Sequence, residues 1–115
     1  MTKVTVIIKS EPYSDESAYT ALKLAHAAVD KGHIVELFLV QGGVFCALRE
    51  QNPSHMQNHY TMLDELITKG VRVVCCGTCT KTRGVAQSLL HPKVEVGSMP
   101  ILADMITSSD STVVF

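Results

Sequence analysis

The chain alternates short apolar runs with longer segments whose apolar residues recur at helical spacing. The apolar runs are rich in β-branched residues and predict strands over residues 3–9, 33–40, 71–75, 93–96 and 112–115. The amphipathic segments predict one helix that starts after Ser14 or Asp15 and ends at Gly32, and further helices near residues 43–50, 58–69, 80–90 and 100–108. We therefore expect one flavodoxin-like α/β domain of three layers over residues 1–115, with a mostly parallel five-stranded sheet. The strand order is not readable from the pattern.

Sheets of this type bind ligands at the loops that follow the carboxyl ends of their strands. Three predicted loops, residues 10–14, 41–44 and 76–83, meet at that edge. We expect Tyr13 and Gln41 to line a site there, together with the residues around Cys76.

Composition and charge narrow the possible partners. Hydrophobic residues make up 46% of the chain and charged residues 18%, which excludes intrinsic disorder. Ten basic and eleven acidic side chains give a net charge of −1, so no overall positive field attracts nucleic acid or anionic lipid. No apolar run in the sequence approaches the roughly 20 residues that a membrane span requires. We expect no direct nucleic-acid partner and no membrane contact.

Four cysteines are the candidate reactive groups. Residues 1–9 lack the apolar stretch and cleavage site of a signal peptide, which favours a cytoplasmic protein. In a reducing cytosol, cysteines are packing residues, metal ligands or reactive thiols more often than structural disulfides. Strand alternation places Cys75 opposite Cys76, so we expect Cys75 in the core, and Cys46 as a second packing residue.

Cys76 ends a predicted strand and leads into a predicted helix. Free backbone amides at a helix start, with Lys81 and Arg83 nearby, favour the thiolate form of a cysteine. We expect Cys76 to react faster than a free thiol at neutral pH, with Cys79 as its partner. The alternative is that both cysteines are small packing residues, although the Gly-Thr pair between them suits a turn better than a core.

Two other chemistries remain open for the Cys76-x-x-Cys79 pair. With His55 and His59 it has the ligand types and spacing of a zinc site, but histidines in a polar segment are solvated by default. A C-x-x-C pair between a strand and a helix also suits dithiol–disulfide exchange, which needs an exposed low-pKa sulfur and a resolving one. Motifs for nucleotide binding and for serine hydrolases are absent from the sequence. We expect no metal and no cofactor.

Residues 74–84, with the sequence VCCGTCTKTRG, resemble the active-site segment of the DsrE/TusD family of sulfur-relay proteins. In that family a strand ends in a cysteine, and a helix with a basic residue and a glycine follows. The similarity places Cys76 at the family cysteine, eight residues before Gly84. Residues 12–25 and 110–115 are similar to the family's first loop and helix and to its ending, so the resemblance runs nearly end to end.

The resemblance implies a cytoplasmic, flavodoxin-like protein that forms homotrimers or hexamers, in some members with sister subunits. Members accept sulfane sulfur as a cysteine persulfide and pass it from donor to acceptor proteins, in tRNA thiolation or dissimilatory sulfur metabolism. Carried over to this chain, the resemblance implies that Cys76 holds the persulfide. The backbone at Gly77 and Thr78, with Lys81 or Arg83, would then stabilise the anionic sulfur.

We therefore expect a sulfur carrier with a sulfurtransferase-like transfer of persulfide sulfur. Cys79 departs from the pattern of the tRNA-thiolation members. Because a thiol can attack a neighbouring persulfide, form a disulfide and release sulfide, Cys79 either protects Cys76 or makes the protein a sulfide-releasing, dithiol-dependent one. The alternatives are a CxxC dithiol–disulfide redox protein and a non-catalytic oligomeric subunit that binds partners.

Overall fold

Five parallel strands form one sheet, in the order β4-β3-β2-β1-β5, within residues 2–55 and 57–115, which the computed structural model describes. The strands are β1 (Lys3–Ile8), β2 (Ile34–Leu39), β3 (Arg72–Cys76), β4 (Glu95–Gly97) and β5 (Ser111–Val114). The helices are α1 (Ser17–Asp30), α2 (His59–Thr68), α3 (Gly77–Thr82) and α4 (Met99–Thr107), and two 3-10 helices are η1 (Gln41–Ala47) and η2 (Gln87–Leu89). The predicted α/β fold with a parallel five-stranded sheet is confirmed.

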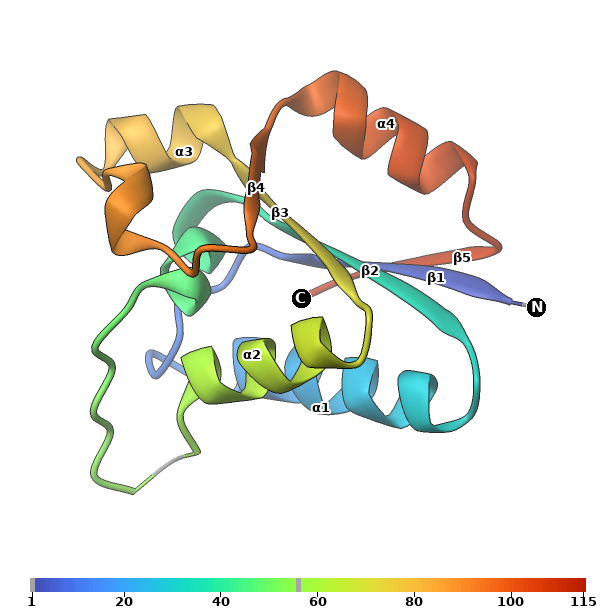
Figure 1. Ribbon diagram of the computed structural model, residues 1–115, viewed down its shortest axis with the longest axis horizontal. Helices are drawn as coiled ribbons and strands as arrows, with labels where there is room; N and C mark the ends of the chain where they lie inside the picture. Colours follow the sequence, from blue (N-terminus) through green and yellow to red (C-terminus); the bar gives the residue numbers. More distant parts are fainter. Residues whose placement is uncertain (1, 56) are drawn as a thin grey trace.

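Helices cover both faces of the sheet, as Figure 1 shows: α1 and α2 lie on one face and α4 on the other. Strand alternation explains the two cores, because successive side chains of a strand point to opposite faces. Fully buried aliphatic residues such as Val6, Leu37 and Leu63 fill the core beneath α1 and α2. On the other face Phe38 and Val74 pack with residues of α4.

The largest difference from the sequence pattern concerns the segment after β3, where a single helix over residues 80–90 was expected. The structure has the short helix α3 there, and the helix ends at Arg83 because Gly84 turns the backbone to a positive φ of 67°. The segment then continues through η2 to β4. A glycine in the left-handed region is a common end of a helix, and the apolar periodicity beyond it belongs to side chains that pack as a loop.

The connections after β3 and β4 leave the sheet on opposite faces. After β3, Val85 and Leu90 pack on the core beneath α1 and α2, whereas after β4 the helix α4 packs on the other face. A parallel sheet has a crevice at such a point, outside the carboxyl ends of the two strands. Cys76 is paired in register with Gly97 at this point, so the last residue of β3 stands beside the crevice.

Candidate functional site

Cys76 is both the last residue of β3 and the residue that precedes the first turn of α3. Its side chain packs with Phe38, Val74 and Met105 on the α4 face of the sheet, and only 5% of the residue is exposed. The strand therefore presents Cys76 at the carboxyl edge of the sheet, as expected, but with its side chain largely covered.

Burial controls the acidity of Cys76. Burial raises the pKa of the Cys76 thiol above its ordinary value, and the hydrogen bond with the Cys79 thiol raises it further. The backbone amides of Cys79 and Thr78 lie close enough to lower the pKa, but they do not outweigh burial. The raised pKa is opposite to the lowered pKa expected from the sequence. The sequence pattern predicted the start of the helix but not the burial of the sulfur.

Cys79 lies one turn further along α3 and is held by a hydrogen bond from another part of the chain. The backbone amide of Gln41 donates to the Cys79 sulfur over 3.0 Å. Gln41 is the first residue of η1, and the first amides of a helix have no partner within it. The side chain of Cys79 packs against both cores, so it lies where the two faces of the sheet meet beyond β3. The structure thus brings Gln41, Cys76 and Cys79 together from three elements.

The position of η1 depends on a close approach of two backbones. The amide of Val40 donates to the carbonyl oxygen of Ile8 over 3.0 Å, and a Cβ atom at Gly43 would overlap that same oxygen. Only glycine can occupy position 43 without moving the end of β1. The backbone of η1, and with it the amide of Gln41, is therefore fixed against β1.

Gln51 is a residue with a structural role at the site that the sequence analysis did not identify. Its side-chain amide donates to the carbonyl oxygens of Phe45, Cys46 and Leu48 over 3.1, 3.1 and 2.9 Å, which closes the end of η1. A single glutamine in a polar segment carries no pattern that distinguishes it from a solvated side chain. Only the hydrogen bonds of Gln51 in the folded protein show that this side chain positions η1.

The remaining predicted residues of α3 lie around the cysteine pair in different ways. Gly77 packs closely against β4, since a Cβ atom there would lie 3.2 Å from Cγ1 of Val96. Thr78 is exposed on the first turn of α3. Lys81 lines a cavity next to Gly77, and the Arg83 guanidinium donates to the carbonyl oxygen of Cys79 over 3.3 Å.

Tyr13 lies against the start of α2. Its hydroxyl donates to Oε1 of Gln51 over 2.5 Å and accepts from the backbone amide of His59 over 3.1 Å, and its ring meets the His59 ring edge-on at 4.3 Å. None of its hydrogen bonds or ring contacts within the described residues involves Cys76 or Cys79. Tyr13 therefore fastens the loop after β1 to α2.

His59 is fully buried and not solvated, contrary to the expectation from its polar segment. Neither ring nitrogen has a hydrogen-bond partner within the described residues, and burial lowers the pKa of His59 despite an opposing effect of the Gln57 backbone. His55 is exposed. No cluster of three or more potential metal ligands occurs among residues 2–55 and 57–115, so the described side chains do not assemble the zinc site that the spacing had left open.

Cys46 and Cys75 are core residues, as expected. Both are fully buried in the core beneath α1 and α2. Burial raises the pKa of each thiol to about 12, with a smaller contribution from neighbouring cysteines. These two thiols stay protonated near neutral pH, which leaves Cys76 and Cys79 as the candidate reactive pair.

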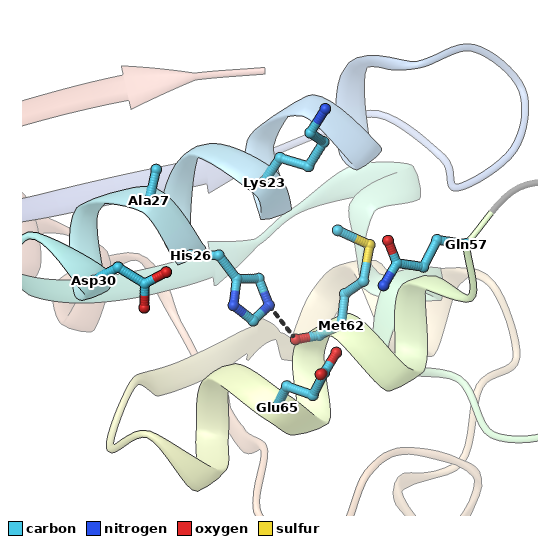
Figure 2. Close-up of a pocket in the computed structure, with 7 residues that line it drawn as sticks. All are labelled: Lys23, His26, Ala27, Asp30, Gln57, Met62 and Glu65. Carbon is cyan, nitrogen blue, oxygen red and sulfur yellow. Dashed lines mark hydrogen bonds between the residues drawn. The ribbon is translucent and has the colours of Figure 1, made fainter.

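Two cavities help to delimit the site. A cavity of about 390 Å³ lies between α1 and α2, where Figure 2 shows the His26 ring hydrogen-bonded to the carbonyl oxygen of Met62 at 3.1 Å. No cysteine lines it, so it does not belong to the candidate site. A second cavity, of about 250 Å³, lies between α3 and β4 and includes Gly77, the residue that follows Cys76.

None of the helices in the described residues has both the length and the apolar character that a membrane span requires.

Comparison with known proteins places the chain in a family. The model of the DsrE/DsrF-like family matches residues 2–115. The chain is 33% identical to the protein YchN of Escherichia coli over 117 residues, with 100% of both chains covered, and the crystal structure of YchN matches with a TM-score of 0.94. It is 30% identical over 86 residues to a sulfurtransferase TusD homolog of Vibrio vulnificus, which covers 72% of this chain and 66% of that protein. It is 26% identical over 129 residues to DsrE of Allochromatium vinosum, with 98% of each chain covered. The chain therefore belongs to the DsrE/DsrF-like family.

Proposed function

We propose that the protein is a sulfur carrier that holds sulfane sulfur as a persulfide on Cys76. The observation that carries this proposal is the placement of the Cys76 sulfur at the carboxyl edge of the sheet, beside the Cys79 thiol and the amides of Thr78 and Cys79. Similarity to a sulfurtransferase TusD homolog supports a role in sulfur relay. The amides are donors for the anionic sulfur of a thiolate or persulfide, in the way that backbone N–H groups stabilise other anions.

Loading and unloading are two exchange reactions of the same type. In loading, the Cys76 sulfur attacks the outer sulfur of a donor persulfide, the donor S–S bond breaks, and the donor leaves as a thiolate that takes up the Cys76 proton. In unloading, an acceptor thiolate attacks the outer sulfur on Cys76, and Cys76 leaves as a thiolate. One S–S bond forms and one breaks in each step, so neither step requires an external oxidant or reductant.

The burial of Cys76 suits a carrier that reacts only with a docked partner. A covered thiol with a raised pKa is largely protonated at neutral pH and so reacts slowly with small electrophiles. The carrier then exchanges sulfur where a partner brings a reactive persulfide directly to the carboxyl edge of the sheet. This arrangement limits loss of sulfur to solvent thiols.

The second candidate is a dithiol–disulfide function, which the proximity of the Cys76 and Cys79 thiols favours. Here the Cys79 thiolate attacks the inner sulfur of the Cys76 persulfide, a Cys76–Cys79 disulfide forms and hydrosulfide leaves. A dithiol reductant must then reduce the disulfide before the next cycle. The proximity of the two sulfurs supports this step. The amount of persulfide kept on Cys76, compared with the amount of hydrosulfide released, distinguishes the two functions.

The proposed setting is the cytoplasm, with protein donors and acceptors of sulfur and a homotrimer or hexamer as the working form. Large apolar side chains on α4 and β5 support self-association, since Met99 is 51% exposed and Val114 is 57% exposed. Sister subunits of the same fold could occupy the same surfaces. A non-catalytic, partner-binding subunit is the outcome if the thiols carry no sulfur.

Intact-protein mass spectrometry after incubation with a sulfane-sulfur donor tests the proposal. We expect the mass of one added sulfur atom on the unmodified protein, on Cys79→Ser and on the core control Cys46→Ala, and none on Cys76→Ser. A loss of two hydrogens that requires both Cys76 and Cys79, without an adduct, would instead indicate dithiol redox chemistry. An unchanged mass for every form would leave a partner-binding subunit.

A further inference from the structure

The surface next to the cysteine pair carries positive charge without acidic residues in its own segment. Residues 77–94 contain Lys81, Arg83 and Lys93 and none of the eleven acidic residues of the chain; Lys81 and Arg83 lie at α3 with Cys79, whereas Lys93 precedes the amino end of β4. None of the ion pairs formed within the described residues involves these three side chains. The protein has a net charge of −1, so this segment is a local excess of positive charge on a slightly acidic molecule.

Within the described residues, neither Glu95 nor Glu11 forms an ion pair with Lys81 or Arg83. Glu95, which follows the segment, is bound by Arg72 through two hydrogen bonds of 2.7 and 3.0 Å. The side chain of Glu11 lies against Gly42, on η1. Lys81 and Arg83 are exposed on α3, and Arg83 is held beside Cys79 by its hydrogen bond to the Cys79 carbonyl oxygen.

An apolar cavity adjoins the positive charge. The cavity of about 250 Å³ between α3 and β4 is lined by Val85, Leu90 and Val96, and Lys81 is the charged residue at its side. Pockets for small ligands measure roughly 300–1,000 Å³, so this cavity lies below that range. It suits one apolar side chain of a docked chain. Val96 is 41% exposed and extends the apolar surface outward.

We propose that this surface binds the segment of a partner protein that carries the sulfur-accepting cysteine, and that acidic residues flank this cysteine together with one apolar side chain. The apolar side chain enters the cavity between α3 and β4, and the acidic residues face Lys81 and Arg83. The cavity lies beside Gly77, which follows Cys76 directly, and Arg83 is held beside Cys79, so a segment anchored there lies along the edge of the sheet where Cys76 ends β3. The inference rests on the proposed carrier function of Cys76.

The transfer itself is the unloading reaction given above. The acceptor cysteine attacks as a thiolate, a new S–S bond forms with the outer sulfur, and the bond between that sulfur and Cys76 breaks. Exposed charge pairs contribute little affinity each, but a complementary field raises the rate of encounter and is screened by salt. The charge preference should therefore show in the rate of transfer and in its dependence on ionic strength.

Transfer to synthetic peptides tests this inference. Three peptides each contain one cysteine and one leucine, and their flanking residues are acidic, uncharged or basic. The persulfide-loaded protein is mixed with each peptide, and the rate of sulfur transfer is measured at low and at high salt. The rate to β-mercaptoethanol, a small uncharged thiol, is measured in parallel. The variants are the double substitution Lys81→Gln/Arg83→Gln and, as a matched control, Lys31→Gln at the end of α1, which lies at the opposite edge of the sheet.

We expect the acidic peptide to receive sulfur about tenfold faster than the basic peptide at low salt, and we expect high salt to remove most of the difference. The double substitution should abolish the preference, Lys31→Gln should keep it, and replacing the leucine of the acidic peptide by serine should slow transfer. Equal rates for the three peptides, or a preference that survives the double substitution, would overturn the inference. If no persulfide forms on Cys76, the carrier function itself fails, which is a distinguishable result; slow transfer to β-mercaptoethanol agrees with the covered position of Cys76.

Discussion

The backbone amide of Gln41 donates a hydrogen bond to the sulfur of Cys79 over 3.0 Å, across a sequence separation of 38 residues. This contact joins the start of η1 to α3 and fixes the Cys79 sulfur beside Cys76. The second cysteine of the pair is therefore positioned to act on the first.

Cys79→Ser should prolong the lifetime of a persulfide on Cys76. The serine hydroxyl can still accept the Gln41 amide, but it cannot attack the persulfide and release hydrosulfide. We expect the unmodified protein to lose its added sulfur and gain a Cys76–Cys79 disulfide, while Cys79→Ser keeps the sulfur. Time-resolved intact mass, with a parallel assay for released sulfide, checks this. Equal persulfide lifetimes in the two proteins would refute a resolving role for Cys79.

Alkylation of Cys76 should be slower than that of free cysteine at neutral pH. Because burial raises the pKa of Cys76, the thiolate fraction near pH 7 is smaller than that of a free thiol, and it increases as the pH rises. Cys79→Ala removes the thiol that raises this pKa further, so the variant should react faster at the same pH. Iodoacetamide labelling with peptide mapping measures both rates. Cys46 and Cys75 are internal controls that should stay unlabelled until the protein unfolds, since their pKa values are raised to about 12.

Gly43→Ala should destabilise the protein by about 3 kcal/mol or more, because the new methyl group overlaps the carbonyl oxygen of Ile8 and neither backbone can move freely. Gly42→Ala is the matched control. Its nearest neighbours are the side chain of Glu11, which is exposed and can rotate away, and the Glu11 backbone nitrogen at 3.3 Å, so we expect a smaller loss of about 1–2 kcal/mol. Chemical denaturation of the two variants gives both values. Similar losses would show that the approach of β1 to η1 is not tightly constrained.

The stability of the protein should decrease as the pH falls below about 6.5, in part because of His59. Burial lowers the pKa of His59, so the unfolded chain binds a proton at a higher pH than the folded chain does. The free energy of unfolding therefore falls with the pH from the ordinary histidine value downward. His59→Phe should reduce the difference in unfolding free energy between pH 7.5 and about pH 5.5, whereas His55→Gln at an exposed position should not. An unchanged pH dependence in His59→Phe would contradict the role assigned to this histidine.

Much of the fold could be predicted from the sequence because its signals are local. Apolar runs and amphipathic spacing predicted the strands and most helices to within a few residues. The cap of α1 differs from the expected Ser14 or Asp15, since the residue before the helix is Glu16, although the Asp15 carboxylate accepts the amide of Ser17 over 2.8 Å. The strand order was not predicted, because periodicity shows which face of a strand is buried but not its neighbours. The helix expected over residues 80–90 was wrong because Gly84 ends α3 after Thr82.

The candidate site could be predicted in part. The position of Cys76 at the end of a strand follows from the chain alone, and so does the convergence of Gln41 with the cysteines. The acidity of Cys76 could not be predicted, since it depends on cover from Phe38 and Met105, which are distant in sequence. Polar contacts between residues distant in sequence could not be predicted either. His91, for example, is buried and bonded to Asp64 at 2.7 Å, although neither residue has a pattern that points to the other.

Locating the carried sulfur in the unmodified protein is the most direct test of whether Cys76 is the sulfur carrier. The protein is loaded with a sulfane-sulfur donor, all sulfurs are alkylated under denaturing conditions immediately after loading, before Cys79 releases the added sulfur, and the digest is analysed by mass spectrometry. Every cysteine keeps its native surroundings during loading, so no substitution can disturb the result. We expect the additional sulfur on Cys76, with Cys46 and Cys75 modified as plain thiols. An additional sulfur on any other cysteine, or on none, would contradict it.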